Sequence, residues 1–158
     1  MINSAEEAAA LVRYSLYAPE GERSFGPTRA IFEHGSDYAT EANKQIVTLA
    51  MIETTRALEE LDAIVATPGL TGVYIGPSDL SLSMGYPPIL AQDEPAVVAA
   101  IEQILATAKG AGLRAGIHCL APSYAKKMID LGFDLVTLGS DIRLLTSATA
   151  AALEEVRA

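Results

Sequence analysis

Two carboxylates stand where apolar runs of the sequence end. Glu53 follows the run 45–52, QIVTLAMI, and Asp79 follows the run 72–75, GVYI; the two acids are 79 − 53 = 26 positions apart. If one strand-helix unit separates them, both lie at the same edge of a sheet. Neighbouring carboxylates repel, which favours protonation of one of them, and a divalent cation removes that penalty. Oxygen ligands of this kind suit Mg²⁺ or Mn²⁺, so the spacing indicates a candidate metal pair.

Each acid also has an ordinary structural explanation. Asp79 could cap a short helix that begins behind it, and Glu53 could sit in a first helical turn, where the helix dipole favours an acid. The turn at Gly76 and Pro77 supports the functional interpretation, because it exposes backbone N–H groups near Asp79 that suit an oxyanion. The spacing alone leaves both interpretations open.

From residue 45 onward, apolar runs alternate with amphipathic segments. The strands are predicted at 45–52, 72–76, 114–120 and 134–140. The helices are predicted at 54–67, 94–112, 121–132 and 141–158, with a short helical piece behind Asp79. Because the run 45–52 has no polar face, we expect it to be buried on both sides. Four consecutive strand-helix units predict an α/β fold with a parallel sheet and right-handed crossovers.

The segment 1–44 is of a different kind. Ser4 and Glu7 form a capping-box pattern ahead of a helix predicted at about residues 5–16. Residues 18–42 are rich in turn formers, which predicts a long loop with short helical pieces. With the four units of 45–158, the chain is expected to form one domain, 1–158. A doubly wound sheet and four units of a (β/α)8 barrel both fit, and both place chemistry at the carboxyl ends of the strands.

Composition excludes several classes of function. The net charge of −9 argues against nucleic acid and against anionic membrane surfaces, since both need a basic footprint. Cys119 is the single cysteine, which rules out an internal disulfide and a cysteine-based zinc site and fits a reducing cytoplasm. The first residues lack the signal-peptide pattern, and no apolar stretch approaches the roughly 18 residues of a membrane span. No glycine-rich phosphate loop supports a nucleotide site. We therefore expect a cytoplasmic protein that acts on a small molecule.

The segment 47–88, VTLAMIETTRALEELDAIVATPGLTGVYIGPSDLSLSMGYPP, resembles the HpcH/HpaI aldolase family of metal-dependent (class II) pyruvate aldolases. The resemblance extends to residues 3–30, NSAEEAAALVRYSLYAPEGERSFGPTRA, and to residues 35–43, GSDYATEAN. The fold that it implies is the C-terminal half of a (β/α)8 TIM barrel, because Met1 corresponds to the segment just after the family's fourth strand.

The resemblance also implies roles for particular residues. Glu53 and Asp79 would bind a divalent cation, Mg²⁺, Mn²⁺ or Co²⁺. The backbone of Gly76, Pro77 and Ser78 would bind the carboxylate of the 2-oxo acid. The catalytic His and Arg of the family would fall in the missing half, so no catalytic residue is assigned here.

Some residues do not carry over from the family. His34, in the sequence FEHG, resembles the family's histidine loop only superficially and receives no role. Met51 replaces the Gln that often precedes the metal-binding glutamate by two residues. His118 ends the third predicted strand, where an imidazole could act as a base, although the resemblance places no histidine there.

The predicted function is that of a carbon–carbon lyase. It would reversibly cleave a 4-hydroxy-2-oxo acid to pyruvate and an aldehyde, incompletely in this chain, and we expect a homo-oligomer. A Schiff-base aldolase needs a lysine on a strand, and all four lysines fall outside the predicted strands. Two alternatives remain: a non-catalytic half-barrel that persists by self-association, which would cover its open strand edges, and a related citrate-lyase-like C–C lyase.

Overall fold

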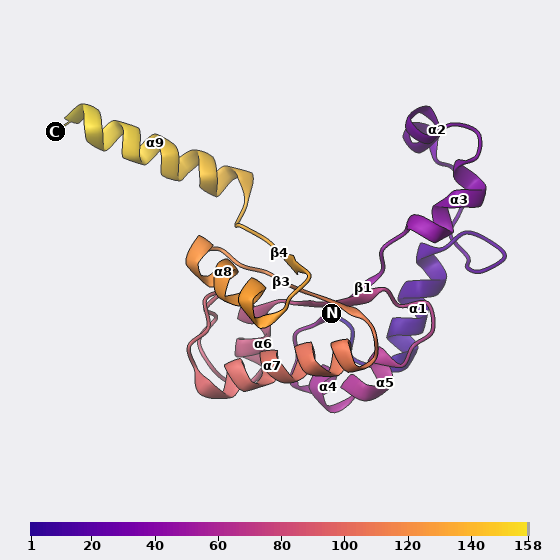
Figure 1. Ribbon diagram of the computed structural model, residues 1–158, viewed down its shortest axis with the longest axis horizontal. Helices are drawn as coiled ribbons and strands as arrows, with labels where there is room; N and C mark the ends of the chain where they lie inside the picture. Colours follow the sequence, from indigo (N-terminus) through magenta and orange to yellow (C-terminus); the bar gives the residue numbers. More distant parts are fainter. Residues whose placement is uncertain (158) are drawn as a thin grey trace.

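The computed structural model describes residues 1–157, which fold around one parallel sheet (Figure 1). Its strands are β1 (Leu49–Ile52), β2 (Gly72–Ile75), β3 (Arg114–Ile117) and β4 (Leu135–Val136). The helices that precede the sheet are α1 (Ala5–Ser15), α2 (Thr28–His34) and α3 (Tyr38–Gln45). The later helices are α4 (Thr55–Glu59), α5 (Leu61–Val65), α6 (Pro77–Ser83), α7 (Pro95–Gly110), α8 (Pro122–Leu131) and α9 (Asp141–Arg157).

The four strands are parallel and lie in the order β1-β2-β3-β4. Ile52 pairs with Ile75, and Ile75 pairs with Ile117, so the carboxyl ends of β1, β2 and β3 are level. This confirms the predicted alternation and brings the residue that follows each strand to one edge of the sheet. The strands are shorter than the predicted runs.

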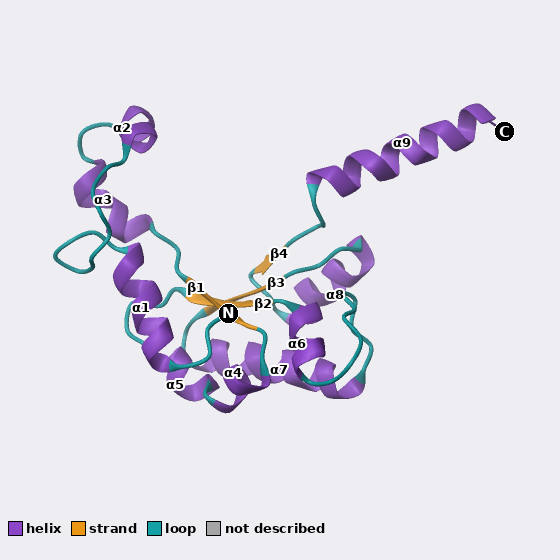
Figure 2. Ribbon diagram, turned by 180° about the vertical axis from the view of Figure 1, so that it is seen from behind, coloured by secondary structure: helices purple, strands orange, loops and turns teal. Residues whose placement is uncertain are grey.

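Helices cover one face of the sheet only (Figure 2). The side chains that face them are fully buried, and they are Ala50, Ile52, Val73, Ile75, Ala115 and Ile117. They pack with buried helical residues such as Ile64 of α5, Leu80 of α6 and Ile104 of α7. A doubly wound sheet carries helices on both faces, whereas a barrel wall carries them only outside. The arrangement is therefore that of part of a barrel wall.

The opposite face of the sheet, here called the inner face, is open in this chain. Leu49, Met51 and Tyr74 alternate with the buried positions and are only half-buried. The prediction that the run 45–52 is buried on both sides is therefore wrong for the chain by itself. An apolar run signals that a second layer is compatible with the strand, not that the same chain supplies that layer.

Local capping explains how individual helices begin. Ser4 Oγ accepts a hydrogen bond from the backbone N–H of Glu7 at 3.3 Å, as the capping box predicts. The Glu7 carboxylate, however, accepts from the backbone N–H of Asn3 at 2.6 Å and not from that of Ser4. The helix predicted at 54–67 is divided into α4 and α5, because Glu60 has φ −97° and ψ 9°, outside the helical region.

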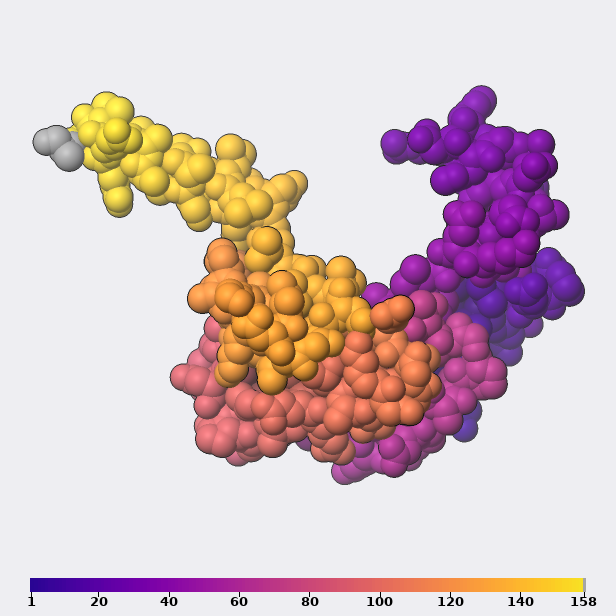
Figure 3. All heavy atoms as spheres, in the orientation of Figure 1, coloured from indigo at the N-terminus to yellow at the C-terminus, as the bar shows by residue number. Residues whose placement is uncertain are grey.

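Two parts of the chain project from the body on either side of a wide hollow (Figure 3). One is the arm formed by α2 and α3, and the other is α9. Neither α2 nor α9 has a buried residue among those described. The helix of the fourth unit therefore does not cover the sheet as the βα pattern predicts. Within residues 1–157 no helix combines the length and apolar character needed to cross a membrane.

Candidate active site

Glu53 is the first residue after β1, and the fold buries its side chain. The residue is 6% exposed, and its Oε2 lies so close to Gly76 that a Cβ at position 76 would overlap it. The neighbouring Thr54 caps α4, since its Oγ1 accepts from the backbone N–H of Ala57 at 3.0 Å. The Thr54 hydroxyl also donates to Asn3 Oδ1 at 2.5 Å. The end of the strand and the helix cap together determine where the Glu53 carboxylate points.

Asp79 lies in the first turn of α6 and is exposed. The helix begins with Pro77, which is fully buried and whose fixed φ suits a first helical position. Gly76 precedes it, and its carbonyl accepts from the backbone N–H of Leu80 at 3.0 Å. The N–H groups of Ser78 and Asp79, in contrast, have no acceptor within their own helix, because first-turn donors have none. The turn therefore combines unpaired N–H donors with an acid.

The two carboxylates share one electrostatic environment. Burial is the largest cause that raises the pKa of Glu53, and the negative charge of Asp79 raises it further. The Met1 ammonium group acts in the opposite direction on that pKa; it lies 3.9 Å from Glu53 Oε1. The structure thus brings together the two acids that the sequence selected, at the carboxyl ends of adjacent strands. Across residues 1–157, no group of three or more His, Cys, Asp or Glu side chains is arranged to hold a metal ion.

His118 lies on the same edge of the sheet, one strand further along. Its backbone N–H donates to the carbonyl of Ile75 at 3.0 Å. Its Nδ1 lies 3.2 Å from the Tyr74 hydroxyl and 3.1 Å from the Thr137 hydroxyl. Sequence reasoning identified His118 but missed these two partners. The signal was available, since Tyr74 and Thr137 each occupy a predicted strand beside that of His118.

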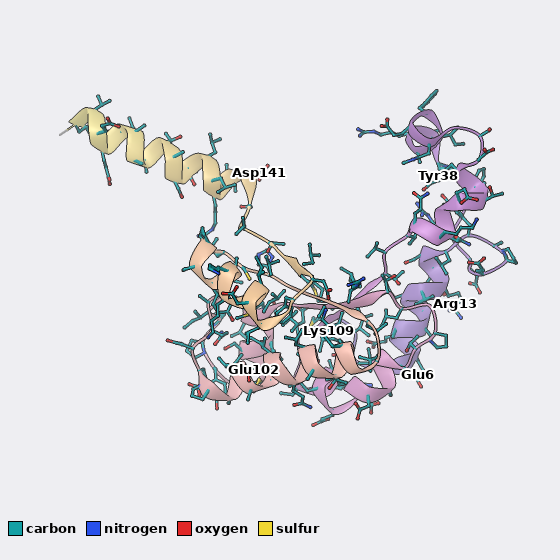
Figure 4. All side chains as sticks on the ribbon, viewed as in Figure 1. Glu6, Arg13, Tyr38, Glu102, Lys109 and Asp141 are labelled. Carbon is teal, nitrogen blue, oxygen red and sulfur yellow. The ribbon has the colours of Figure 1, made fainter. Side chains whose placement is uncertain are left out.

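The other residues that the sequence offered as candidates have different surroundings. His34 stacks on Tyr38 in the projecting arm, with ring centroids 5.7 Å apart, and Figure 4 shows Tyr38 there, far from Asp141 at the start of α9. Cys119 is fully buried, and burial raises the pKa of its thiol to about 11, as befits a small core residue. The four lysines lie on helices; they are Lys44, Lys109, Lys126 and Lys127.

Comparison with known proteins identifies the family. The family model for HpcH/HpaI aldolase/citrate lyase matches residues 1–148. The chain belongs to this family. It is 40% identical over 158 residues to a hydroxypyruvate/pyruvate aldolase of Rhizorhabdus wittichii, covering 100% of this chain and 63% of the relative. It is 37% identical over 151 residues to a 2-keto-3-deoxy-L-rhamnonate aldolase of Klebsiella pneumoniae, covering 94% of this chain and 56% of the relative.

Solved structures of the family have the same fold. A HpcH/HpaI aldolase/citrate lyase family protein from Burkholderia cenocepacia superposes with a TM-score of 0.88 at 32% identity, covering 100% of this chain and 63% of that one. A HpcH/HpaI aldolase from Desulfitobacterium hafniense superposes with a TM-score of 0.85 at 26% identity, covering 99% and 61%. The chain thus spans about 60% of the length of the family members it matches. The family resemblance and the fold class, four βα units of a TIM-type barrel, are both confirmed.

Proposed function

We propose that this chain carries the metal and 2-oxo acid site of a class II pyruvate aldolase. Its reaction would be the reversible cleavage of a 4-hydroxy-2-oxo acid to pyruvate and an aldehyde. The C3–C4 bond breaks, the C4 hydroxyl loses its proton, and C3 of the pyruvate half gains one. The observation that supports this function most is the buried Glu53 beside Asp79 at the rim where barrel enzymes place their chemistry.

The two acids are chemically suited to a divalent cation. Both supply hard oxygen ligands, and the pKa of Glu53 is raised by burial and by Asp79, a penalty that a cation would relieve. Glu53 and Asp79 would hold Mg²⁺, Mn²⁺ or Co²⁺, which when bound supplies Lewis-acid stabilisation of the negative charge that develops on the keto oxygen. Two carboxylates leave room for water and substrate oxygens around such an ion.

The turn behind β2 would bind the carboxylate of the 2-oxo acid. The segment Gly76–Pro77–Ser78 leads into α6, whose first N–H groups have no acceptor within the helix. Negative charge is favoured at this end of a helix. Gly76 has a second function, because its lack of a side chain makes room for Glu53. The turn would thus orient the pyruvate half of the substrate next to the metal-binding acids.

The proton-transfer groups of the family are not assigned to residues of this chain. We propose that the chain forms the C-terminal half of a single barrel domain and needs the other half for full activity. The inner face of its sheet is open, and β1 and β4 are edge strands that another segment could pair with. These surfaces would suit the other half of the barrel, and they would also suit a homo-oligomer, which we expect to be cytoplasmic. A non-catalytic half-barrel that self-associates is the second candidate, favoured by the same open surfaces. The aldolase names of the relatives favour aldol chemistry over citrate-lyase-like cleavage.

A metal titration tests the site. Mn²⁺ binding would be measured by calorimetry for the wild-type chain, Glu53→Ala and Asp79→Ala, with Asp62→Ala as the control, because Asp62 is an exposed acid on α5. Each site variant should bind Mn²⁺ at least about 10–100-fold more weakly, the loss that even outer-shell partners of a metal cause. The control should bind as the wild type does. Equal affinity in all four proteins would contradict the assignment.

An activity assay tests the requirement for the second half. The completed chain is defined here as residues 1–158 preceded by the first four βα units of the Rhizorhabdus wittichii relative. Pyruvate release from a 4-hydroxy-2-oxo acid would be measured with Mn²⁺ for both proteins. The chain alone should be slower by about 10²–10⁴-fold or more, the usual contribution of a general acid–base. Near-equal turnover would show that residues 1–158 hold a complete catalytic set.

A further inference from the structure

The imidazole of His118 is held on the inner face of the sheet by two hydroxyl groups. Its Nδ1 contacts Tyr74 on β2 and Thr137 just after β4, at 3.2 and 3.1 Å. The residues on either side of His118 belong to the helix-facing layer, since Ile117 and Cys119 are both fully buried. His118 itself is only half-buried. The side chain is therefore oriented by its neighbours on a face that is open to a ligand.

The available protons determine which ring nitrogen carries hydrogen. The Thr137 hydroxyl has one proton and an alternative acceptor for it, the carbonyl of Cys119 at 3.3 Å. For the Tyr74 proton, Nδ1 of His118 is the acceptor that the described residues provide. Tyr74 donating to Nδ1 leaves the neutral ring with its hydrogen on Nε2. The cluster formed by Tyr74, His118 and Thr137 thus presents an N–H donor away from its own hydroxyl groups.

The position of this donor follows from the strand register. The backbone of His118 bonds to Ile75, the last residue of β2, so His118 is level with the turn that begins at Gly76. The donor is thus at the height of the proposed 2-oxo acid site, on the neighbouring strand. A substrate whose pyruvate half occupies the turn would extend its remaining part over adjacent strands.

We propose that His118 is a specificity-determining residue whose Nε2–H donates a hydrogen bond to an oxygen of the aldehyde-derived half of the substrate. This inference rests on the proposed aldolase function and deepens it. It predicts a preference for aldehydes that carry a hydroxyl or other acceptor oxygen beside the reacting carbon. A site built to bond such a group discriminates against the apolar analogue, because its own polar group would be left unpaired.

The first test measures the tautomer of His118 by ¹H–¹⁵N NMR on residues 1–158. The chain has two histidines, so a His34→Asn variant assigns the His118 signals. We expect a strong preference for the Nε2–H tautomer in the wild type and a weaker preference in Tyr74→Phe, where only the Thr137 hydroxyl remains beside Nδ1. A predominant Nδ1–H tautomer in the wild type would overturn the inference, because Nε2 would then have no proton to donate.

The second test measures aldehyde preference with the completed chain, Mn²⁺ and pyruvate. Glycolaldehyde and propanal are nearly isosteric and differ by a hydroxyl in place of a methyl group. His118→Leu should lower the ratio of their kcat/KM values by about 3–10-fold, the value of one hydrogen bond. His118→Gln, which keeps an N–H donor, should retain part of the preference, and His34→Leu should leave it unchanged. An unchanged ratio in an active His118→Leu variant overturns this inference but leaves the aldolase function standing. No aldol addition by the wild-type completed chain overturns the proposed function, and this inference with it.

Discussion

Replacing Gly76 by alanine should disturb the candidate site. The backbone at Gly76 has φ −97° and ψ 93°, a conformation that alanine adopts without strain. The obstacle is instead the carboxylate of Glu53, because the added Cβ would overlap Glu53 Oε2. Gly76 is buried, so the new methyl group has no open space to enter. The Glu53 carboxylate must therefore move from its position.

The free energy of unfolding should fall by about 1–3 kcal/mol, the usual cost of overpacking a well-packed region. For a chain of this length that corresponds to a melting temperature lower by about 2–12 °C. The variant should also bind Mn²⁺ more weakly, because one of its two proposed ligands is displaced. Gly110→Ala is the matched control: nothing lies within 4 Å of its added Cβ, and we expect a gain of at most about 1 kcal/mol.

A double-mutant cycle assigns the effect to Glu53. Glu53→Ala removes the overlapping oxygen, and the Glu53 Cβ is 3.6 Å from the new methyl group, an ordinary contact distance. Adding Gly76→Ala to Glu53→Ala should therefore cost little, which gives a coupling energy of about 1–3 kcal/mol from urea unfolding. If Gly76→Ala destabilised both backgrounds equally, the packing of Glu53 against Gly76 would be refuted.

Two pH-dependent predictions concern the acids at opposite ends of the sheet. Burial and Asp79 raise the native pKa of Glu53 above its ordinary value of 4.5. The folded state therefore prefers the protonated acid, and this preference adds to the free energy of unfolding in full below pH 4.5. The contribution is lost as the pH rises through the native pKa. In the metal-free chain, Glu53→Gln should therefore reduce the fall of the free energy of unfolding between pH 4 and 8, measured by urea unfolding. An unaltered pH profile would contradict the raised pKa of Glu53. Lys109, the backbone N–H of Ala115 and Arg114 lower the native pKa of Asp134 well below its ordinary value of 3.8. Asp134→Asn should lower the free energy of unfolding by about 1–2 kcal/mol at pH 7. The difference from the wild type should shrink as the pH falls below 3.8, the ordinary pKa of the acid. A difference that did not depend on pH would show that the charge of Asp134 contributes nothing to stability.

The order of elements and the pair of acids were predictable because both depend on local patterns. Alternating apolar and amphipathic segments identify βα units, and parallel strands place the residues that follow them at one edge. Glu53 and Asp79 then come together without any further information. The family resemblance, confirmed by the match over residues 1–148, added the proposal that the turn at Gly76 binds the carboxylate of the 2-oxo acid.

What the sequence did not predict depends on partners outside the local pattern. An apolar run such as 45–52 looks the same whether its second face is covered by the same chain or by another segment. The amphipathic pattern of α9 likewise predicts a covering helix, although the helix projects away from the sheet. The hydroxyl partners of His118 come from the two strands that flank it, and side-chain bonds across strands are not visible in a single run of residues.

The contrast between Asp134 and Glu53 supports a division of the sheet into a structural end and a chemical end. Asp134 lies at the amino end and is paired with Lys109, with Arg114 at 2.9 Å and with the backbone N–H of Ala115 at 2.9 Å. Glu53 lies at the carboxyl end, more deeply buried, and within residues 1–157 no hydrogen-bond donor reaches its carboxylate; the Met1 ammonium is 3.9 Å away. A buried acid whose pKa is raised by a second acid opposes folding in the absence of a ligand. A cation that bound both acids would remove this cost, which supports the proposed metal site at this end of the sheet.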